Sequence, residues 1–187
     1  MQKEIARVLV GLSIILLAPS SLAQSTVELE GSITMGEGDL GIEGISVSDN
    51  HHLVLAHGAN LVIYLVDSNS PENNSQIEWS GGYSLLDSSF HPGGETAIMV
   101  GEGGNVLRLT LANSSIEQAG SASTFGDTLL TSVSWNGDGS WAYIGGEDGW
   151  IWRFRGTSEG GIEAIVLENR GDRVISGISV SYTHLTL

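Results

Sequence analysis

The sequence contains no cysteine and only one lysine, Lys3, in 187 residues. The absence of cysteine excludes disulfides, thiolate metal sites, a catalytic cysteine and a lipid-modified N-terminal cysteine. Residues 24–187 carry 21 acidic residues against five arginines. Nucleic acids and anionic membranes bind clusters of Lys or Arg, and this composition provides none. We therefore exclude both classes of partner.

Residues 1–23 have the pattern of an export signal. Lys3 and Arg7 precede an apolar run, Val8–Ala18, and small residues precede an expected cleavage before Gln24. As a helix the run would rise only about 16 Å, roughly half of a bilayer core, which favours a cleaved signal over a membrane anchor. We expect an exported protein, extracellular or at the cell surface, or periplasmic in a double-membrane bacterium, with no membrane insertion by the mature part.

A repeated pattern organises the rest of the chain. Residues 132–154 hold three short apolar runs separated by Gly-Asp turns, the pattern of three antiparallel strands. Identical or similar residues recur 45 positions apart in two such stretches: Ser89 and Ser134, Phe90 and Trp135, Gly94 and Gly139, Ala97 and Ala142, Glu102 and Glu147, Gly104 and Gly149, Arg108 and Arg153. Four short strands in about 45 residues form one blade of a β-propeller. A β-sandwich or jelly roll is the alternative, but neither requires a fixed period.

We predict an all-β fold, a β-propeller with about three four-stranded blades and the start of a fourth. An N-terminal strand and linker occupy residues 24–40. The blades are expected at residues 41–83, 84–127 and 128–172, with the next starting at 173. Three blades do not close a ring, which usually needs at least four, so we expect a fragment of a larger propeller. No amphipathic helix is expected after the signal.

Two stretches resemble blades of the WD-repeat family. They are Phe90–Glu95 and Trp135–Ser140, each followed by an apolar strand, a Gly-rich turn and a strand ending in Arg108 or Arg153. The resemblance is divergent, because the Gly-His pair is missing and Trp-Arg stands where Trp-Asp is expected. It implies a disc-shaped scaffold that binds partners on its faces, usually without catalysis. Separately, residues 181–187 resemble translated sequencing-adapter read-through, so we expect a non-native tail.

The turn residues are predicted to have structural roles: Gly93, Gly94, Gly103, Gly104, Gly137, Asp138, Gly139 and Gly149. The turn at Asn136, Asp138 and Ser140 also has, with Glu147, the oxygen spacing of a calcium loop, although Trp141 stands where that loop requires glycine. The same turn resembles the Asp-box of sialidase-type propellers, which is structural. We interpret it as a strand turn and predict no metal, cofactor or catalytic residue.

Several other side chains are candidate sites. His51, His52 and His57 could suggest a metal site, but a strand separates the last two by roughly 16 Å, too far for one ion. We expect them to be exposed turn histidines. Arg108 and Arg153 occupy equivalent positions, which favours a structural role. The tryptophans are expected to pack between blades, with Trp150 a candidate contact at the rim. Two Asn-x-Ser sequons, at Asn73 and Asn113, are candidate glycosylation sites.

These observations favour an exported, non-enzymatic scaffold that binds another protein or an extracellular polymer and carries no cofactor. The alternative is a fragment of an exported carbohydrate-active propeller enzyme, of sialidase or lyase type, whose active site lies in blades that this sequence lacks.

Overall fold

The computed structural model of the chain describes residues 41–48, 50–58, 63–77, 79–157, 162–180 and 185–186. All of them belong to one compact unit, Gly41–Leu187. The predicted export signal, the predicted strand and linker at 24–40 and most of the predicted tail at 181–187 lie outside the described residues.

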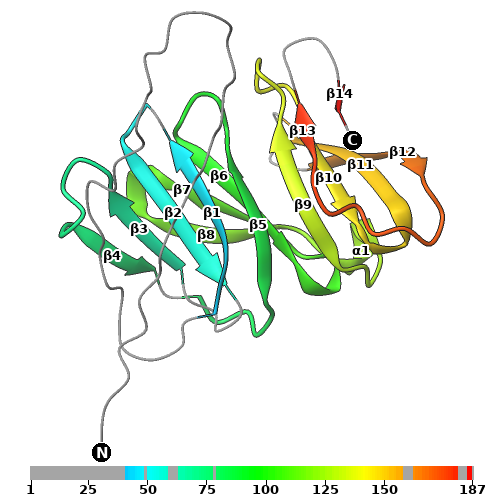
Figure 1. Ribbon diagram of the computed structural model, residues 1–187, viewed down its shortest axis with the longest axis horizontal. Coiled ribbons are helices and arrows are strands. Elements are labelled where there is room, and N and C mark those ends of the chain that lie inside the picture. Colours follow the sequence, from blue (N-terminus) through cyan, green and yellow to red (C-terminus); the bar gives the residue numbers. More distant parts are fainter. Residues whose placement is uncertain are drawn as a thin grey trace, which may run out of the picture. The chain divides into compact units, whose positions relative to one another are not determined.

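Three four-stranded antiparallel sheets follow one another along this part of the chain, which confirms the all-β expectation (Figure 1). In each sheet every strand pairs with the next one in the chain. The first sheet contains β1 (Ile42–Ser48), β2 (Leu53–Gly58), β3 (Ile63–Asp67) and β4 (Asn74–Ile77); the second contains β5 (Leu85–Phe90), β6 (Thr96–Gly101), β7 (Val106–Thr110) and β8 (Ser115–Gly120); the third contains β9 (Leu130–Trp135), β10 (Ala142–Gly146), β11 (Trp150–Gly156) and β12 (Ile162–Asn169).

Short elements connect the sheets or follow them. They are the 3-10 turns η1 (Glu102–Gly104), η2 (Leu111–Asn113) and η3 (Glu147–Gly149), the one-turn helix α1 (Ala122–Phe125), and the short strands β13 (Ser179–Val180) and β14 (Leu185–Thr186), which pair with each other. The sequence predicted four strands in each unit, but it located neither α1 nor β8. The β8 segment, Ser-Ile-Glu-Gln-Ala-Gly, has a single β-branched residue, so its strand conformation depends on pairing with β7 rather than on local propensity.

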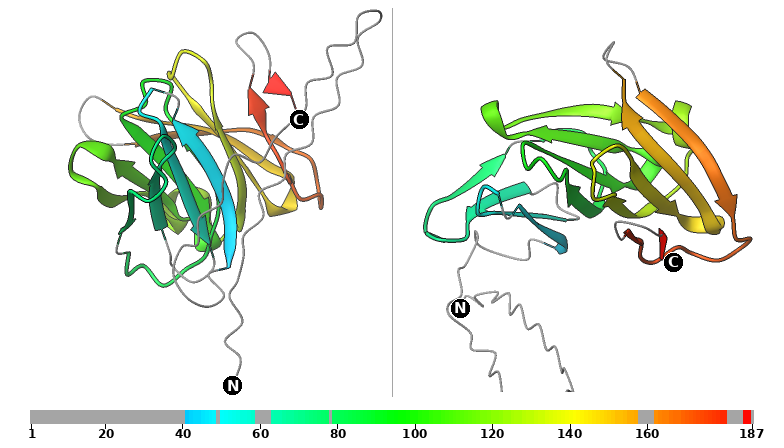
Figure 2. Two further views of the ribbon diagram at one scale, coloured as in Figure 1. Left: turned by 60° about the vertical axis from the view of Figure 1, so that its left-hand side comes forward. Right: turned by 90° about the horizontal axis from the view of Figure 1, so that it is seen from above.

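The first strands of the three sheets lie next to one another. The strand β5 contacts β1 of the first sheet and β9 of the third, as the views in Figures 1 and 2 show. The second sheet is therefore packed on both faces. In β6, Ala97 and Met99 join the apolar cluster shared with the first sheet, and Ile98 and Val100 join the cluster shared with the third. This division follows the alternation of side chains along a strand.

Corresponding elements of the second and third sheets lie 45 residues apart. The strands β5 and β9 start at Leu85 and Leu130, and the turns η1 and η3 start at Glu102 and Glu147. Glu102 contacts Ser84, the residue before β5, and Glu147 contacts Leu129, the residue before β9, through the same two hydrogen bonds. The backbone N–H of the glutamate donates to the carbonyl of Ser84 or Leu129, and its carboxylate accepts the N–H of the same residue at 3.0 Å.

Tight turns need glycine where the backbone enters the left-handed region. Gly94 and Gly139 occupy equivalent places in the turns after β5 and β9, with φ of +78° and +71°. At Gly139 a Cβ would also lie only 2.3 Å from Nε2 of His91. Gly171 has a similar φ, +73°, but a Cβ there would meet nothing within 4 Å.

Gly139 and Gly171 form a matched pair for a stability test. Both alanine variants incur the left-handed penalty of about 1 kcal/mol. Gly139→Ala must also displace His91, so we expect it to lower the free energy of unfolding by about 2–3 kcal/mol, against about 1 kcal/mol for Gly171→Ala. Urea unfolding followed by tryptophan fluorescence measures both. Equal losses would show that the contact with His91 has no energetic weight.

Candidate functional site

Three turns meet along one end of the sheets and form the candidate site. They connect β1 to β2, β5 to β6 and β9 to β10, and we call their residues the turn surface: 50–52, 91–94 and 136–140. Asn50 Nδ2 donates to the carbonyl of Pro92 at 3.0 Å, and a ring nitrogen of His91 bonds the carbonyl of Gly139 at 3.1 Å. Each turn is thus fixed to the next by a hydrogen bond between sheets.

The bonding pattern of His91 defines its tautomer. Its Nδ1 accepts the N–H of Gly93 at 3.0 Å, so the ring proton must lie on Nε2, the atom that faces the carbonyl of Gly139. The ring also packs edge-on against Trp135, with centroids 4.8 Å apart. His91 therefore binds the third sheet through one polar and one aromatic contact.

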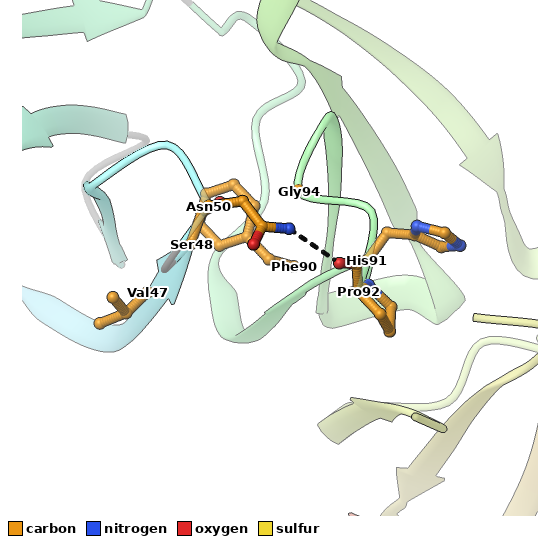
Figure 3. A pocket seen from close by; sticks show the side chains of 7 residues that line it. All are labelled: Val47, Ser48, Asn50, Phe90, His91, Pro92 and Gly94. Atoms are coloured by element: carbon orange, nitrogen blue, oxygen red, sulfur yellow. Dashed lines mark hydrogen bonds between the residues drawn. The ribbon is translucent and has the colours of Figure 1, made fainter. Parts of the chain in front are cut away.

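A shallow pocket opens between the first two turns (Figure 3). Its volume is about 170 Å³, smaller than the pockets that enclose drug-sized ligands. The sticks in Figure 3 show the Asn50 amide pointing to the carbonyl of Pro92 across it. The pocket has room for one side chain of a partner. It is lined by Val47, Ser48, Asn50, Phe90, His91, Pro92 and Gly94.

The polar groups of the third turn bond to one another. Asn136 Oδ1 accepts the N–H of Trp141 at 3.0 Å, and its amide donates to Ser140 Oγ at 2.9 Å. Asp138 accepts the N–H of Ser140 at 2.8 Å, and hydrogen bonds from Ser140 lower the pKa of Asp138. These bonds are those of a strand turn that fixes its own backbone.

The residues with the oxygen spacing of a calcium loop do not converge. Glu147 lies beyond β10, and a strand of that length places it roughly 16 Å from the turn at Asn136. Its carboxylate accepts the N–H of Leu129 instead. Among the residues that the structure describes, no three His, Asp or Glu side chains are grouped so as to hold a metal ion.

The expectation for the three histidines is correct for two and wrong for one. His51 and His52 are exposed in the first turn. His57 is fully buried in β2, with Nδ1 3.3 Å from the carbonyl of Leu85. The ring fits because β1 has a glycine beside it: a Cβ on Gly44 would lie 2.4 Å from His57 Cε1. That glycine is 13 positions away in the sequence, so no local pattern marks the space.

The two equivalent arginines have different environments. Arg108 forms an exposed ion pair with Glu117, and its side chain is 44% exposed. Arg153 lies over the ring of Trp141, with Cζ 4.2 Å from the ring centroid. Of the remaining aromatic residues, Trp150 is 37% exposed and stacks on Trp152, with centroids 6.0 Å apart. Its exposure is compatible with the predicted contact at the rim, which stays a prediction.

A partly buried carboxylate on β5 joins the second and third sheets, and the sequence did not reveal it. Asp87 Oδ2 accepts the N–H of Val133 on β9 at 2.8 Å, and Oδ1 accepts the N–H of Ser88 at 2.9 Å. Burial raises the pKa of Asp87, and the two hydrogen bonds oppose that rise. A serine two residues later repeats the contact: Ser89 Oγ accepts the N–H of Trp135 at 3.3 Å.

Comparison of the sequence with protein-family models gives no match, and comparison with curated proteins gives none either. The likeness to WD-repeat blades therefore rests on the sequence motifs alone. In the part of the chain that the structure describes, no helix has both the length and the apolar character needed to cross a bilayer.

Buried His57 makes stability depend on pH. Burial lowers the pKa of His57 to about 4, against the smaller opposing effect of the Leu85 hydrogen bond. In the unfolded chain the ring has the ordinary pKa of 6.5, so the unfolded state takes up the proton first as the pH falls. As the pH falls from 6.5 to 4, His57 therefore lowers the free energy of unfolding by about 3 kcal/mol in total.

We expect His57→Asn, which does not titrate, to remove that pH dependence. Urea unfolding of both proteins at pH 7.5, 5.5 and 4.5 tests this. The wild type should lose stability more steeply than the variant. Because its pKa is raised, Asp87 increases the free energy of unfolding as the pH falls. This effect is the same in both proteins, so it cancels when they are compared. Parallel losses would show that His57 is accessible to protons in the folded chain.

Proposed function

We propose that the chain is part of an exported β-propeller that serves as a non-enzymatic scaffold for binding a protein or an extracellular polymer. Three features support the propeller. The sheets are four-stranded meanders in chain order, their first strands are neighbours, and corresponding elements of the second and third sheets recur at 45 residues. Blades of propellers are arranged in this way around a central axis.

The proposed binding role is based on the turn surface. Turns from three sheets are joined by the Asn50 and His91 hydrogen bonds, so a partner would meet a fixed surface that loses little conformational entropy on binding. His51 and Pro92 are exposed on it, next to a pocket sized for one side chain. Exposed groups around such a pocket are the usual anatomy of a protein-binding surface.

Paired variants test this role. His51→Ser with Pro92→Ser changes exposed groups of the turn surface. Asp127→Ser with Asp172→Ser changes exposed groups at the opposite end of the sheets, beside α1 and η3. Immobilised residues 24–187 should capture a defined partner from extracellular extracts of the source cells, and the first pair should weaken that interaction at least tenfold while the second pair leaves it unchanged.

Both pairs must keep the wild-type melting temperature for the comparison to hold. Equal binding by the two variants would place the interaction elsewhere. If glycoside cleavage accompanied capture, the carbohydrate-active alternative would replace the scaffold.

Export and glycosylation give a second test. Asn73 and Asn113 are both exposed, in the loop before β4 and in η2. Expression of the whole chain in a glycosylating eukaryotic host should give a secreted protein that begins at Gln24 and carries two N-glycans. Asn73→Gln and Asn113→Gln should each remove one, measured by intact mass. Retention in the cell with Met1 in place would contradict the export signal.

A further inference from the structure

We propose that the third sheet carries a carboxylate-binding site centred on Arg153 and Trp141, which recognises an isolated Asp or Glu side chain of a peptide partner. The site lies on the face of the third sheet that points away from the second sheet. It does not depend on the turn surface having a partner.

The side-chain alternation of β11 defines that face. Trp152 and Phe154 belong to the apolar cluster shared with the second sheet. Arg153 lies between them in the strand, so its side chain projects from the opposite face, as does that of Arg155. The guanidinium carbons of Arg153 and Arg155 lie 4.2 and 4.3 Å from the centroid of Trp141.

The two arginines differ in their counter-charges. Arg155 is paired with Glu163, with Nη2 2.7 Å from Oε2. Arg153 has no ion pair or hydrogen bond among the described residues, and its Nε is buried without a partner. The positive charge of Arg153 is thus balanced only by the π face of Trp141. Arg173 also has no ion pair among the described residues, but it is exposed, whereas Arg153 is half-buried. In a chain of formal net charge -15, Arg153 is therefore the arginine whose charge an anionic ligand would offset.

The second sheet provides an internal control, because its strand register places equivalent residues in one row. Across the second sheet the row reads Ser89, Ile98, Arg108 and Glu117. Across the third sheet it reads Ser134, Tyr143, Arg153 and Ile165. Both rows have the arginine. Ile165 stands in the third sheet where Glu117 neutralises Arg108 in the second, and Tyr143 stands where the second sheet has buried Ile98.

Packing of a further sheet on this face would leave the arginine accessible. In the second sheet Ile98 is covered by the third sheet, while Arg108 of the same row remains 44% exposed at the side. By the same geometry a fourth sheet would cover Tyr143 and leave Arg153 at the rim.

The chemistry favours one carboxylate rather than a polyanion. A guanidinium held against an aromatic ring presents its remaining N–H groups in a fixed fork that matches a carboxylate. A polyuronate carries a charge on every sugar and would be repelled by the acidic surface, whereas a peptide with one acidic side chain would not.

The test uses residues 24–187 and two capped peptides, Gly-Gly-Glu-Gly-Gly and Gly-Gly-Gln-Gly-Gly, with a polyuronate chain as a third ligand. Binding is followed by NMR at the indole N–H of Trp141 and the Nε–H of Arg153. We expect a saturable shift with the Glu peptide, at a dissociation constant at least tenfold lower than that of the Gln peptide or, per carboxylate, of the polyuronate.

Matched variants separate this site from non-specific attraction to arginine. Arg153→Gln should abolish the response at Trp141, and Arg108→Gln should leave it unchanged. Arg153→Lys keeps the charge and the fold but loses the fork, and should weaken binding about fivefold. Equal affinity for the Glu and Gln peptides, tighter binding of the polyuronate per carboxylate, or equal loss in Arg108→Gln would overturn the proposal.

Discussion

The structure depends on how the edge of each sheet is satisfied. The first strand of a four-stranded meander has a partner on one side only, so half of its N–H groups point away from its own sheet. At the second interface these groups meet side chains of the preceding first strand: Asp87 accepts the N–H of Val133, and Ser89 accepts that of Trp135. The first strands of the second and third sheets are thus joined by polar bonds as well as by the apolar contacts between the sheets.

Other hydrogen bonds from side chains also join neighbouring sheets. Ser88 Oγ donates to Ser46 Oγ at 2.9 Å, which joins β5 to β1, and buried His57 bonds the carbonyl at the start of β5. At the turn end, Asn50 and His91 repeat the pattern from one turn to the next. Apolar clusters supply the burial, and these bonds determine the register of one sheet on another. A fixed register is what makes a surface assembled from several sheets suitable for binding.

The strands and turns were largely predictable from the sequence because they are local. Glycine-rich turns and β-branched runs predicted an all-β chain of four-stranded units, and the structure has three four-stranded antiparallel sheets. The outer strand β8 and the burial of His57 were missed, because one depends on pairing with β7 and the other on Gly44 of a neighbouring strand. The roles of Asp87 and Trp141 were missed for the same reason: each is defined by residues far away in the sequence.

Amide hydrogen exchange at Val133 tests the joining of the sheets most directly. Its N–H points out of its own sheet and is protected only by Asp87. We predict slow exchange in the wild type, acceleration by at least roughly tenfold in Asp87→Ala, and an unchanged rate at Ile144 in the core of the same sheet. Rapid exchange at Val133 in the wild type, or a rate that Asp87→Ala leaves unaltered, would contradict it.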